Sequence, residues 1–173
     1  MRRRLHARAG ALWLACSLGA ATSCAHDPAG APAQGDAAQM SLTAAAERGT
    51  FPGGAEHFTG EATIGMLFAP NGPRDFGGAS VTFQAGARTG WHTHPAGQTL
   101  VVTEGSGWVQ IDGDARRDMR SGDVVWIPPD TRHWHGATAT TAVTHIALQG
   151  AVDGAVVTWA EPVSDAQYLG SAE

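Results

Sequence analysis

From about residue 57 onward, the chain is a succession of short runs rich in Val, Thr, Ile, Phe and Trp, separated by Gly, Pro and Asp. We expect strands in these runs: 58–68, 79–84, 89–94, 98–104, 106–112, 123–127, 132–136, 141–149 and 155–161. No window has a helical stripe before SDAQYLG at 164–170. Many short strands with regular turn signals are typical of a sandwich or barrel. The pattern therefore predicts an all-β domain.

Glycine and proline place the predicted connections between these runs. The stretches TEGSGW at 103–108 and DGDARR at 112–117 predict tight hairpin turns, because glycine beside small polar residues supplies the backbone angles that such turns need. IPPD at 127–130 predicts a loop, since neither proline has an N–H to donate to a neighbouring strand. The expected sheet is thus built from strands joined by short connections.

The first 24 residues have the pattern of an export signal. MRRRLHAR is basic, GALWLACSLGAA is apolar, and ATSCAHD offers small residues for cleavage. The apolar run is shorter than the ~20 residues that span a bilayer. Cys24 follows three small residues as in a lipoprotein cleavage box, which leaves lipidation of Cys24 and ordinary cleavage both open. Both outcomes predict an exported protein, either periplasmic or lipid-anchored to the membrane facing the periplasm.

Residues 25–50 separate this leader from the strand-rich part. They are rich in Ala, Gly and Pro and have no apolar periodicity, which predicts a flexible linker. Within them, SLTAAAERG at 41–49 is either a single helix turn or an extension of the linker. The chain is therefore divided into a leader (1–24), a linker (25–50) and one domain (51–173).

Charge and composition exclude several classes of function. All 11 basic residues are arginines, so Schiff-base chemistry on a lysine, including that of pyridoxal phosphate, is impossible. Beyond residue 24, 7 arginines stand against 16 acidic residues, a net charge of −9. This argues against nucleic acid or an anionic membrane surface as a partner. Cys16 and Cys24 both lie in the leader, so the domain has no disulfide, cysteine nucleophile or thiolate metal ligand.

Five of the eight histidines lie between residues 92 and 145. His92 and His94 point to one side of a strand, because side chains two residues apart share a face. The same holds for His133 and His135 in TRHWHGA, and His145 in TAVTHIALQ lies on a further strand. Buried imidazoles need polar partners, and a divalent metal is one. The clustering therefore favours a metal site over five separate structural histidines.

Two stretches resemble the two motifs of the cupin family. GARTGWHTHPAGQTLVVTEG at 86–105 has the glycines and the His-x-His pair of the first motif, and GDVVWIPPDTRHWH at 122–135 resembles the second. Asp130 replaces a usual glycine and Ala137 a usual asparagine. The resemblance covers residues 57–162 and implies a cupin double-stranded β-helix, a jelly-roll barrel. It also implies that one metal is held by His92, His94, Gln98 and His133.

Within the cupins, ASVTFQAGARTGWHTHPAGQTLVVTEGSGWVQ and TAVTHIALQ resemble the bacterial hydroxynitrile lyases. Those proteins contain manganese and split cyanohydrins such as mandelonitrile into an aldehyde and hydrogen cyanide. The resemblance implies a small-molecule substrate and one divalent transition metal, with manganese favoured. Iron, nickel, cobalt and zinc are chemically acceptable at a site of nitrogen and oxygen donors. Cupins commonly pair their barrels, so the likeness also implies a homodimer.

Gln98 stands where a cupin usually has a carboxylate. A neutral amide with three imidazoles leaves a divalent ion its full positive charge, which makes the ion a stronger Lewis acid. The absence of an anionic protein ligand also disfavours a higher oxidation state. Both effects favour non-redox chemistry over dioxygen activation. The alternative is that Gln98 is a hydrogen-bonding residue beside a three-histidine site.

His135 and His145 are the candidate acid–base residues, since an imidazole with a pKa near ~6.5 exchanges protons at neutral pH. His145 is the favoured base, while His135 has the alternative role of orienting a ligand. Strand parity predicts a substrate pocket lined by Val81, Phe83, Leu100, Val102, Ala147 and Gln149. Four tryptophans fall between these positions and are expected on the outer face or between sheets: Trp91, Trp108, Trp126 and Trp134.

Three functions are compatible with these residues. The first is lyase chemistry of the hydroxynitrile type, in which His145 takes the hydroxyl proton and cyanide leaves near a histidine or Gln149. The second is a metal-dependent dioxygenase of small organic molecules, which dioxygen consumption would reveal. The third is a non-enzymatic periplasmic binding module, which would retain a ligand without forming product.

Overall fold

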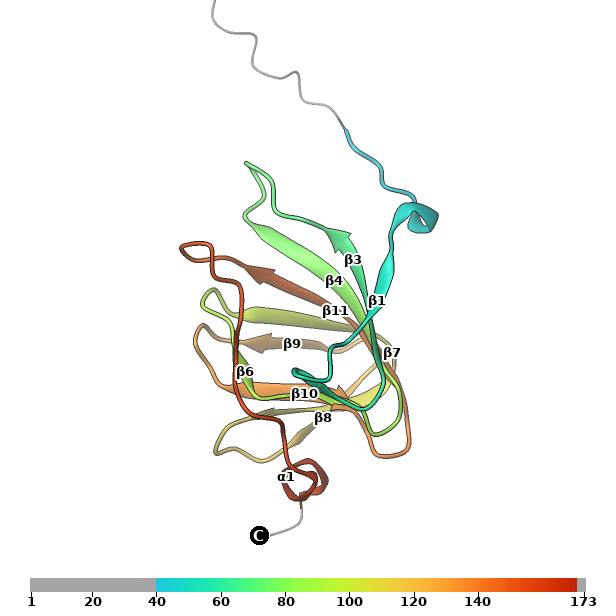
Figure 1. Cartoon of the computed structure of the whole chain (residues 1–173), viewed down its shortest axis with the longest axis vertical. Coiled ribbons are helices and arrows are strands. Elements are labelled where there is room, and N and C mark those ends of the chain that lie inside the picture. The colour runs from blue at the N-terminus through green and yellow to red at the C-terminus, as the bar shows by residue number, and fades with distance from the viewer. Residues whose placement is uncertain (1–39, 171–173) are drawn as a thin grey trace, which may run out of the picture. The chain divides into compact units, whose positions relative to one another are not determined.

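The structure, a computed structural model, describes residues 40–170 (Figure 1). The predicted leader and most of the predicted linker therefore lie outside the described residues. Residues from Leu42 onward belong to one compact unit. Its regular structure begins with a short 3₁₀ helix, η1 (Ala45–Glu47), and the first strand follows at Thr50. No helix within 40–170 is long and apolar enough to cross a membrane.

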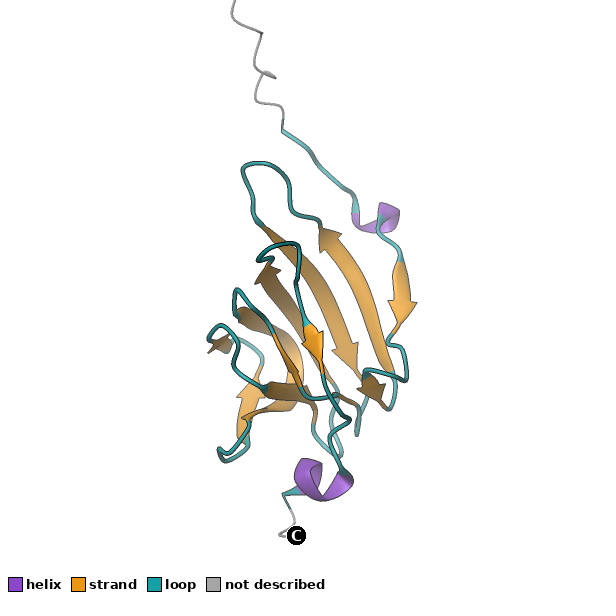
Figure 2. Ribbon diagram, turned by 60° about the vertical axis from the view of Figure 1, so that its left-hand side comes forward, coloured by secondary structure: helices purple, strands orange, loops and turns teal. Residues whose placement is uncertain are grey.

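Twelve strands between residues 40 and 170 form one curled antiparallel sheet with two halves (Figures 1 and 2). One half contains, in spatial order, β1 (Thr50–Pro52), β3 (Ala62–Phe68), β4 (Phe76–Phe83), β11 (Val143–Gly150), the start of β7 (Gln98–Ile111) and β9 (Val124–Ile127). The other half contains β8 (Arg117–Arg120), the end of β7, β10 (His133–Ala137), β5 (Arg88–Thr89), β2 (Phe58–Thr59), β6 (His92–Thr93) and β12 (Thr158–Trp159). The all-β prediction is confirmed.

Strand β7 joins the two halves, and it corrects the prediction of a hairpin turn at TEGSGW. The strand continues through these residues instead of reversing. Its glycines are needed for bending and close approach: Gly105 has a φ of 72°, and a Cβ there would lie 2.1 Å from the carbonyl oxygen of Ala142. Gly107 approaches the carbonyl of Gly136 equally closely. Local composition alone does not separate a turn glycine from one that admits a neighbouring backbone.

Two other predicted strands are each divided into two. The run at 58–68 breaks at Gly60, which has a φ of 80° and where a Cβ would meet the backbone of Ala87. As a result, β2 pairs with β5 while β3 pairs with β4 in the other half. The run at 89–94 likewise gives β5 and β6, which both pair with β10. The break at Gly60 is thus where the chain passes between the two halves.

The remaining connections largely follow the sequence. DGDARR contains the turn between β7 and β8, and IPPD is a loop in which Asp130 takes a φ of 56° in place of the usual glycine. SDAQYLG contains α1 (Asp165–Leu169), capped by the Ser164 side chain at its N-terminus. The sequence does not predict strands β1 and β8. β8 has the sequence RDMR, in which only the buried Met119 carries an apolar side chain.

The inner faces of the two halves enclose the main apolar core. Its buried residues include Phe83, Leu100, Val102 and Ile127. A second cluster lies on the outer side of β10, where α1 packs against the sheet. It contains Trp91, Trp134, Val163 and Tyr168, with Trp108 half-buried against it. Strand β10 is therefore covered on both sides, by histidines inward and by tryptophan outward. Trp126, on β9, is 57% exposed.

Candidate metal centre

Strand pairing brings histidines that are distant in sequence to one place. His92 on β6 is paired directly with His133 on β10. His94 follows β6 by one residue, and Gln98 is the first residue of β7. All four side chains are buried. The residues predicted to hold a metal therefore come from β6 and the residue after it, from its partner strand β10, and from β7, which joins the two halves of the sheet.

The backbone fixes the ring orientation of three of these histidines. Nδ1 of His92 lies 3.0 Å from the carbonyl oxygen of Gly90, and Nδ1 of His133 lies 2.8 Å from that of Thr131. Nδ1 of His94 lies 2.8 Å from the carbonyl oxygen of Val156. Because a carbonyl only accepts, each Nδ1 must carry the proton and donate it. In the neutral rings, each Nε2 is then left with a free lone pair.

For His94 and His133 these lone pairs have no satisfactory partner among the described protein atoms. Nε2 of His94 is buried without any hydrogen bond. Nε2 of His133 lies 3.1 Å from Oε1 of Gln98, so two acceptors face each other. The amide of Gln98 is oriented by its Nε2, which donates to Oε1 of Gln149 at 3.5 Å. A cation satisfies such converging acceptors, and nitrogen and oxygen donors suit a divalent transition metal. The residues present therefore fit a bound metal.

Ring positions add His135 to this group. The donor atoms of His92, His133 and His135 all lie within 4.8 Å of one another. The ring of His94 is centred 5.1 Å from that of His92 and 5.8 Å from that of His133. The tightest histidine cluster in the described chain thus contains His135 where the sequence reasoning placed His94. The four predicted residues lie near one another, and His135 is a further neighbour of His92 and His133.

His135 and His145 form a pair of their own. Nε2 of His145 lies 3.1 Å from Nδ1 of His135, and both rings contact Phe83. His145 is completely buried, and its Nδ1 has no partner among the described atoms. It shares the inward face of β11 with Val143 and Ala147, as strand parity predicts. It nevertheless lies behind His135 and does not reach the cavity, contrary to the expectation that it faces the metal directly.

Burial keeps these imidazoles neutral near pH 7. Desolvation lowers the pKa of His133 and of His145 to about 4. It also lowers the pKa of His94, and it lowers those of His92 and His135 well below their ordinary value, with repulsion from neighbouring imidazoles adding to the effect. The neutral ring is the form that binds a metal or accepts a proton. The site is therefore ready for either role without prior deprotonation.

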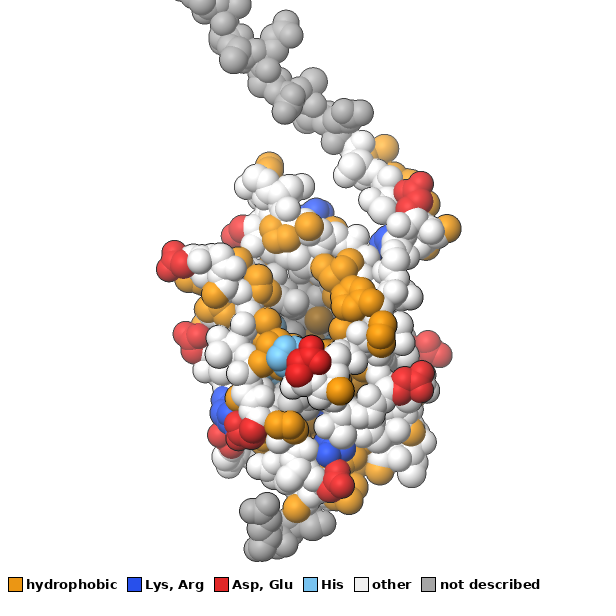
Figure 3. All heavy atoms as spheres, viewed as in Figure 1, with side chains coloured by type: hydrophobic (Ala, Val, Ile, Leu, Met, Phe, Trp, Pro, Cys, Tyr) orange, Lys and Arg blue, Asp and Glu red, His pale blue; other side chains and the backbone are white. Residues whose placement is uncertain are grey.

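A cavity of about 180 Å³ opens beside the histidines. The polar residues that line it are Thr89, His92, His94, Gln98, His135 and Gln149, and the remaining lining residues are Phe58, Ile64, Met66, Gly78, Ala79, Val81, Ala147, Val157 and Trp159. Figure 3, a space-filling view from the same direction as Figure 1, shows a hollow edged by hydrophobic side chains. Such a cavity, apolar with a few convergent polar groups, is typical of a small-molecule site.

The predicted pocket residues divide into two groups. Val81, Ala147 and Gln149 line the cavity, as expected. Phe83, Leu100 and Val102 lie deeper, in the apolar core, and do not line it. Parity gave the correct face for all six, because all but the half-buried Gln149 are buried on the inward side. Depth along the barrel decides which of them reach the cavity, and parity carries no information on depth.

Sequence reasoning missed several residues that line the cavity, among them four large apolar ones. Phe58 and Trp159 come from the short strands β2 and β12, and Ile64 and Met66 come from β3. The sequence predicts strands in these runs, so alternation alone could have proposed inward faces for them. The missing information was which ends of those strands lie at the open mouth of the barrel.

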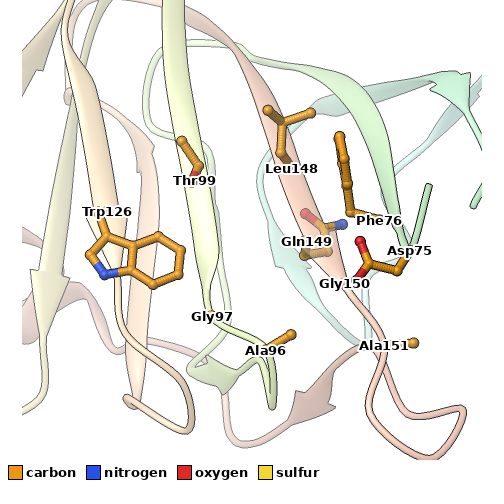
Figure 4. Close-up of a pocket in the computed structure, with 10 residues that line it drawn as sticks. All are labelled: Asp75, Phe76, Ala96, Gly97, Thr99, Trp126, Leu148, Gln149, Gly150 and Ala151. Carbon is orange, nitrogen blue, oxygen red and sulfur yellow. The ribbon is translucent and has the colours of Figure 1, made fainter. Parts of the chain in front are cut away.

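A second hollow, of about 390 Å³, lies on the outer side of β11, β7 and β9 (Figure 4). It is lined by Asp75, Phe76, Ala96, Gly97, Thr99, Trp126, Leu148, Gln149, Gly150 and Ala151. It contains no histidine, and Gln149 is the one residue that it shares with the cavity. The chemistry of the candidate site therefore belongs to the smaller cavity.

Comparison with known proteins agrees with this architecture. Residues 79–148 match the cupin domain model. The chain is also 54% identical over 116 residues to a protein of Granulicella tundricola named (R)-mandelonitrile lyase, an alignment that covers 67% of this chain and 88% of the relative. The chain belongs to the cupin family. The likeness to this relative supports a cupin lyase, and the three-histidine cluster agrees with the metal binding that is general among cupins.

Solved cupin structures have the same fold. A cupin-like protein of Thermotoga maritima is 38% identical and superposes with a TM-score of 0.66, over 70% of this chain and 92% of that one. A cupin barrel protein of Rhodopseudomonas palustris is 19% identical, with a TM-score of 0.56 over 74% of this chain and 88% of that one. The second likeness concerns the fold alone.

Proposed function

We propose that this cupin is a metal-dependent lyase of the hydroxynitrile type, which splits a cyanohydrin into a carbonyl compound and hydrogen cyanide. The observation that carries the proposal is a cluster of buried histidines with unprotonated Nε2 atoms and the amide oxygen of Gln98, beside a cavity for a small molecule. The name of the Granulicella relative supplies the reaction class. The absence of an anion among these four donors favours non-redox chemistry over dioxygen activation.

His92, His94, Gln98 and His133 would hold the metal, which we propose to be manganese by resemblance. When bound, such an ion supplies a Lewis acid that stabilises negative charge on a substrate oxygen. The backbone carbonyls of Gly90, Val156 and Thr131 hold the three imidazoles in the tautomer that this requires. Partners of this kind typically change metal affinity or activity 10- to 100-fold when they are lost.

His135 is the proposed general base. It lines the cavity, whereas His145, which the sequence favours, lies behind it. When Nδ1–H of His135 donates to Nε2 of His145, Nε2 of His135 is free to accept the hydroxyl proton of the cyanohydrin. The O–H electron pair then forms the carbonyl, and the electrons of the carbon–carbon bond leave with cyanide. The protonated His135 returns its proton to cyanide, so hydrogen cyanide departs and the neutral pair is restored.

In this scheme His145 is a positioning residue. Its Nε2 lies 3.1 Å from Nδ1 of His135, and this contact fixes the ring orientation of the base. The amide of Gln149, on the same strand, lies at the other end of the cavity beside Gln98 and offers a hydrogen-bond donor to the leaving cyanide. Each group named for the reaction thus has a fixed position before substrate enters.

The test is cleavage of mandelonitrile by the full chain, followed as benzaldehyde release, with and without added manganese. Protein stripped with a chelator is the matched control and should be inactive until metal is restored. Metal-loaded protein that cleaves no cyanohydrin would refute the proposal. Consumption of dioxygen during turnover would instead identify a dioxygenase, and a ligand retained without product would identify a binding protein.

We further propose that the protein is exported. The support is the basic, apolar and small-residue pattern of residues 1–24, which lie outside the described structure. Mass spectrometry of protein from the producing cell should find a mature chain without the leader, carrying or lacking lipid on Cys24. An intact segment from Met1 to Cys24 in that protein would contradict export by this route.

A further inference from the structure

Trp159 occupies a position in the cavity that nothing in the metal centre or the acid–base pair explains. Strand β12 pairs with β6 so that Trp159 lies opposite His92. The two rings are centred 4.8 Å apart, and the indole lines the cavity beside this candidate ligand. A large aromatic side chain is thus held in the cavity wall, directly beside a candidate metal ligand.

The indole is supported from behind and from the side. The ring of His57 stacks on it with centroids 4.4 Å apart and an angle of 7° between the planes. Phe58 lies 5.8 Å from it at an angle of 56°. Hydrogen bonds also tie these residues to the candidate metal centre: Gly90 N–H donates to the carbonyl of His57, and Gly90 accepts from His92. Trp159 and His92 therefore have a fixed relative position.

The cavity has the size and the chemistry for one aromatic ring. Its volume is about 180 Å³, and an apolar cavity of ~150 Å³ binds benzene. Its lining combines the polar histidine group with apolar side chains that include Phe58, Met66 and Trp159. A molecule with a small polar carbon centre and a single aryl group matches this mixed lining. Aromatic pairs in offset or edge-to-face contact gain stability beyond the area that they bury.

We propose that Trp159 is the residue that selects aryl over small alkyl substrates, with His57 as its support. The predicted preference in reaction rate rests on the proposed cyanohydrin chemistry. The predicted preference in binding does not, because the indole forms part of the cavity wall whatever reaction follows. The aryl group of the substrate lies against the indole while its polar carbon faces the histidines.

The experiment compares mandelonitrile with the cyanohydrin of acetaldehyde in the full-length wild type, Trp159→Ala and Trp159→Phe. Trp159→Ala should lose about 10- to 50-fold in kcat/KM for mandelonitrile, mainly through KM, because aryl burial and stacking are both lost. The loss for the acetaldehyde cyanohydrin should stay within about threefold, and Trp159→Phe should be intermediate. Metal content should be unchanged. Equal losses for the two substrates would overturn the proposal.

Controls separate selection from damage to the fold. Trp126→Ala removes a tryptophan that is 57% exposed and lines the outer hollow but not the cavity, so it should change neither substrate's kinetics. His57→Ala should raise KM for mandelonitrile several-fold without changing KM for the acetaldehyde cyanohydrin. This variant provides the test of the proposal if Trp159→Ala does not fold. Calorimetric binding of benzyl alcohol and ethanol gives an answer if the wild type cleaves neither substrate: weaker benzyl alcohol binding in Trp159→Phe supports the role of Trp159, and unchanged binding refutes it.

Discussion

Two groups of buried histidines lie next to each other in this barrel, and they differ in the partner of Nδ1. In His92, His94 and His133 that partner is a backbone carbonyl, which forces the free lone pair onto Nε2. In His135 it is another imidazole, His145, which can donate or accept. A carbonyl locks one tautomer, whereas a second imidazole permits proton movement. The same residue type is thereby suited to metal binding in one group and to proton transfer in the other.

The largest expected effect is loss of the metal. His133→Ala should remove most bound metal and with it all measurable cyanohydrin cleavage, because it deletes a donor from the centre of the group. His145→Ala should keep its metal, since the contacts of His145 are with His135 and Phe83 and it is not one of the proposed ligands. Metal analysis of both purified variants measures this. Equal metal loss in the two would erase the distinction between the groups.

The division between the groups is tested most sharply at His94 and His135. We expect His94→Ala to weaken metal binding, because its buried Nε2 has no other partner among the described residues. His135→Ala should retain metal but lose roughly 10²–10⁴ in rate, the usual contribution of a general base. Metal titration and mandelonitrile kinetics of both variants decide the matter. If His135→Ala lost the metal and His94→Ala did not, His135 would be the ligand.

A smaller effect is expected at His145. His145→Gln retains a hydrogen-bonding group near His135 but cannot take up a proton. The rate should fall by about 10- to 100-fold, as for other partners that orient a functional imidazole. A role in positioning also predicts a changed dependence of kcat on pH, which general loss of stability would not produce. Wild-type rate and pH profile in this variant would leave His145 without a part in the reaction.

Gln98 tests the charge of the metal group. Gln98→Glu should keep or tighten metal binding, because it adds an anion to a site of neutral donors. It should also slow cleavage, since the added charge lowers the Lewis acidity of the ion. Gln98→Asn, which keeps the amide on a shorter side chain, separates charge from geometry. Unchanged affinity and unchanged rate in Gln98→Glu would refute this explanation of the amide.

The smallest effect concerns acid stability of the metal-free protein. Burial lowers the pKa of His145 from 6.5 to about 4. Between these values the unfolded chain binds the proton and the folded chain does not, so stability is complete above pH 6.5 and is lost as the pH falls toward 4. From about pH 6.5 to about 5.5, His145 alone should cost about 1 kcal/mol of unfolding free energy. In urea unfolding experiments at several pH values, the unfolding free energy of His145→Gln should fall less steeply with decreasing pH than that of the wild type. Parallel plots of unfolding free energy against pH for the two proteins would disprove the prediction.

Strand periodicity and motif spacing determined a large part of this protein in advance. Alternation placed the central histidines on inward faces, and the resemblance to the cupin motifs indicated that HTH, Gln98 and His133 belong together. These predictions succeed because side-chain direction in a strand is a local property of the backbone. Other local signals also served: the missing N–H groups of two prolines predicted the IPPD loop, and a helical stripe indicated the final helix.

Only the tertiary structure decided how deep in the barrel each inward side chain lies and which distant side chains it contacts. Periodicity is the same for His135 and His145, yet the curl of the sheet brings one to the cavity and buries the other behind it. It also placed Trp159 against His92 through the pairing of two-residue strands. At Gly105 and Gly107 it turned apparent hairpin signals into a bend within one strand. Pairing register and sheet curvature depend on contacts between distant residues, and no local pattern in the sequence records them.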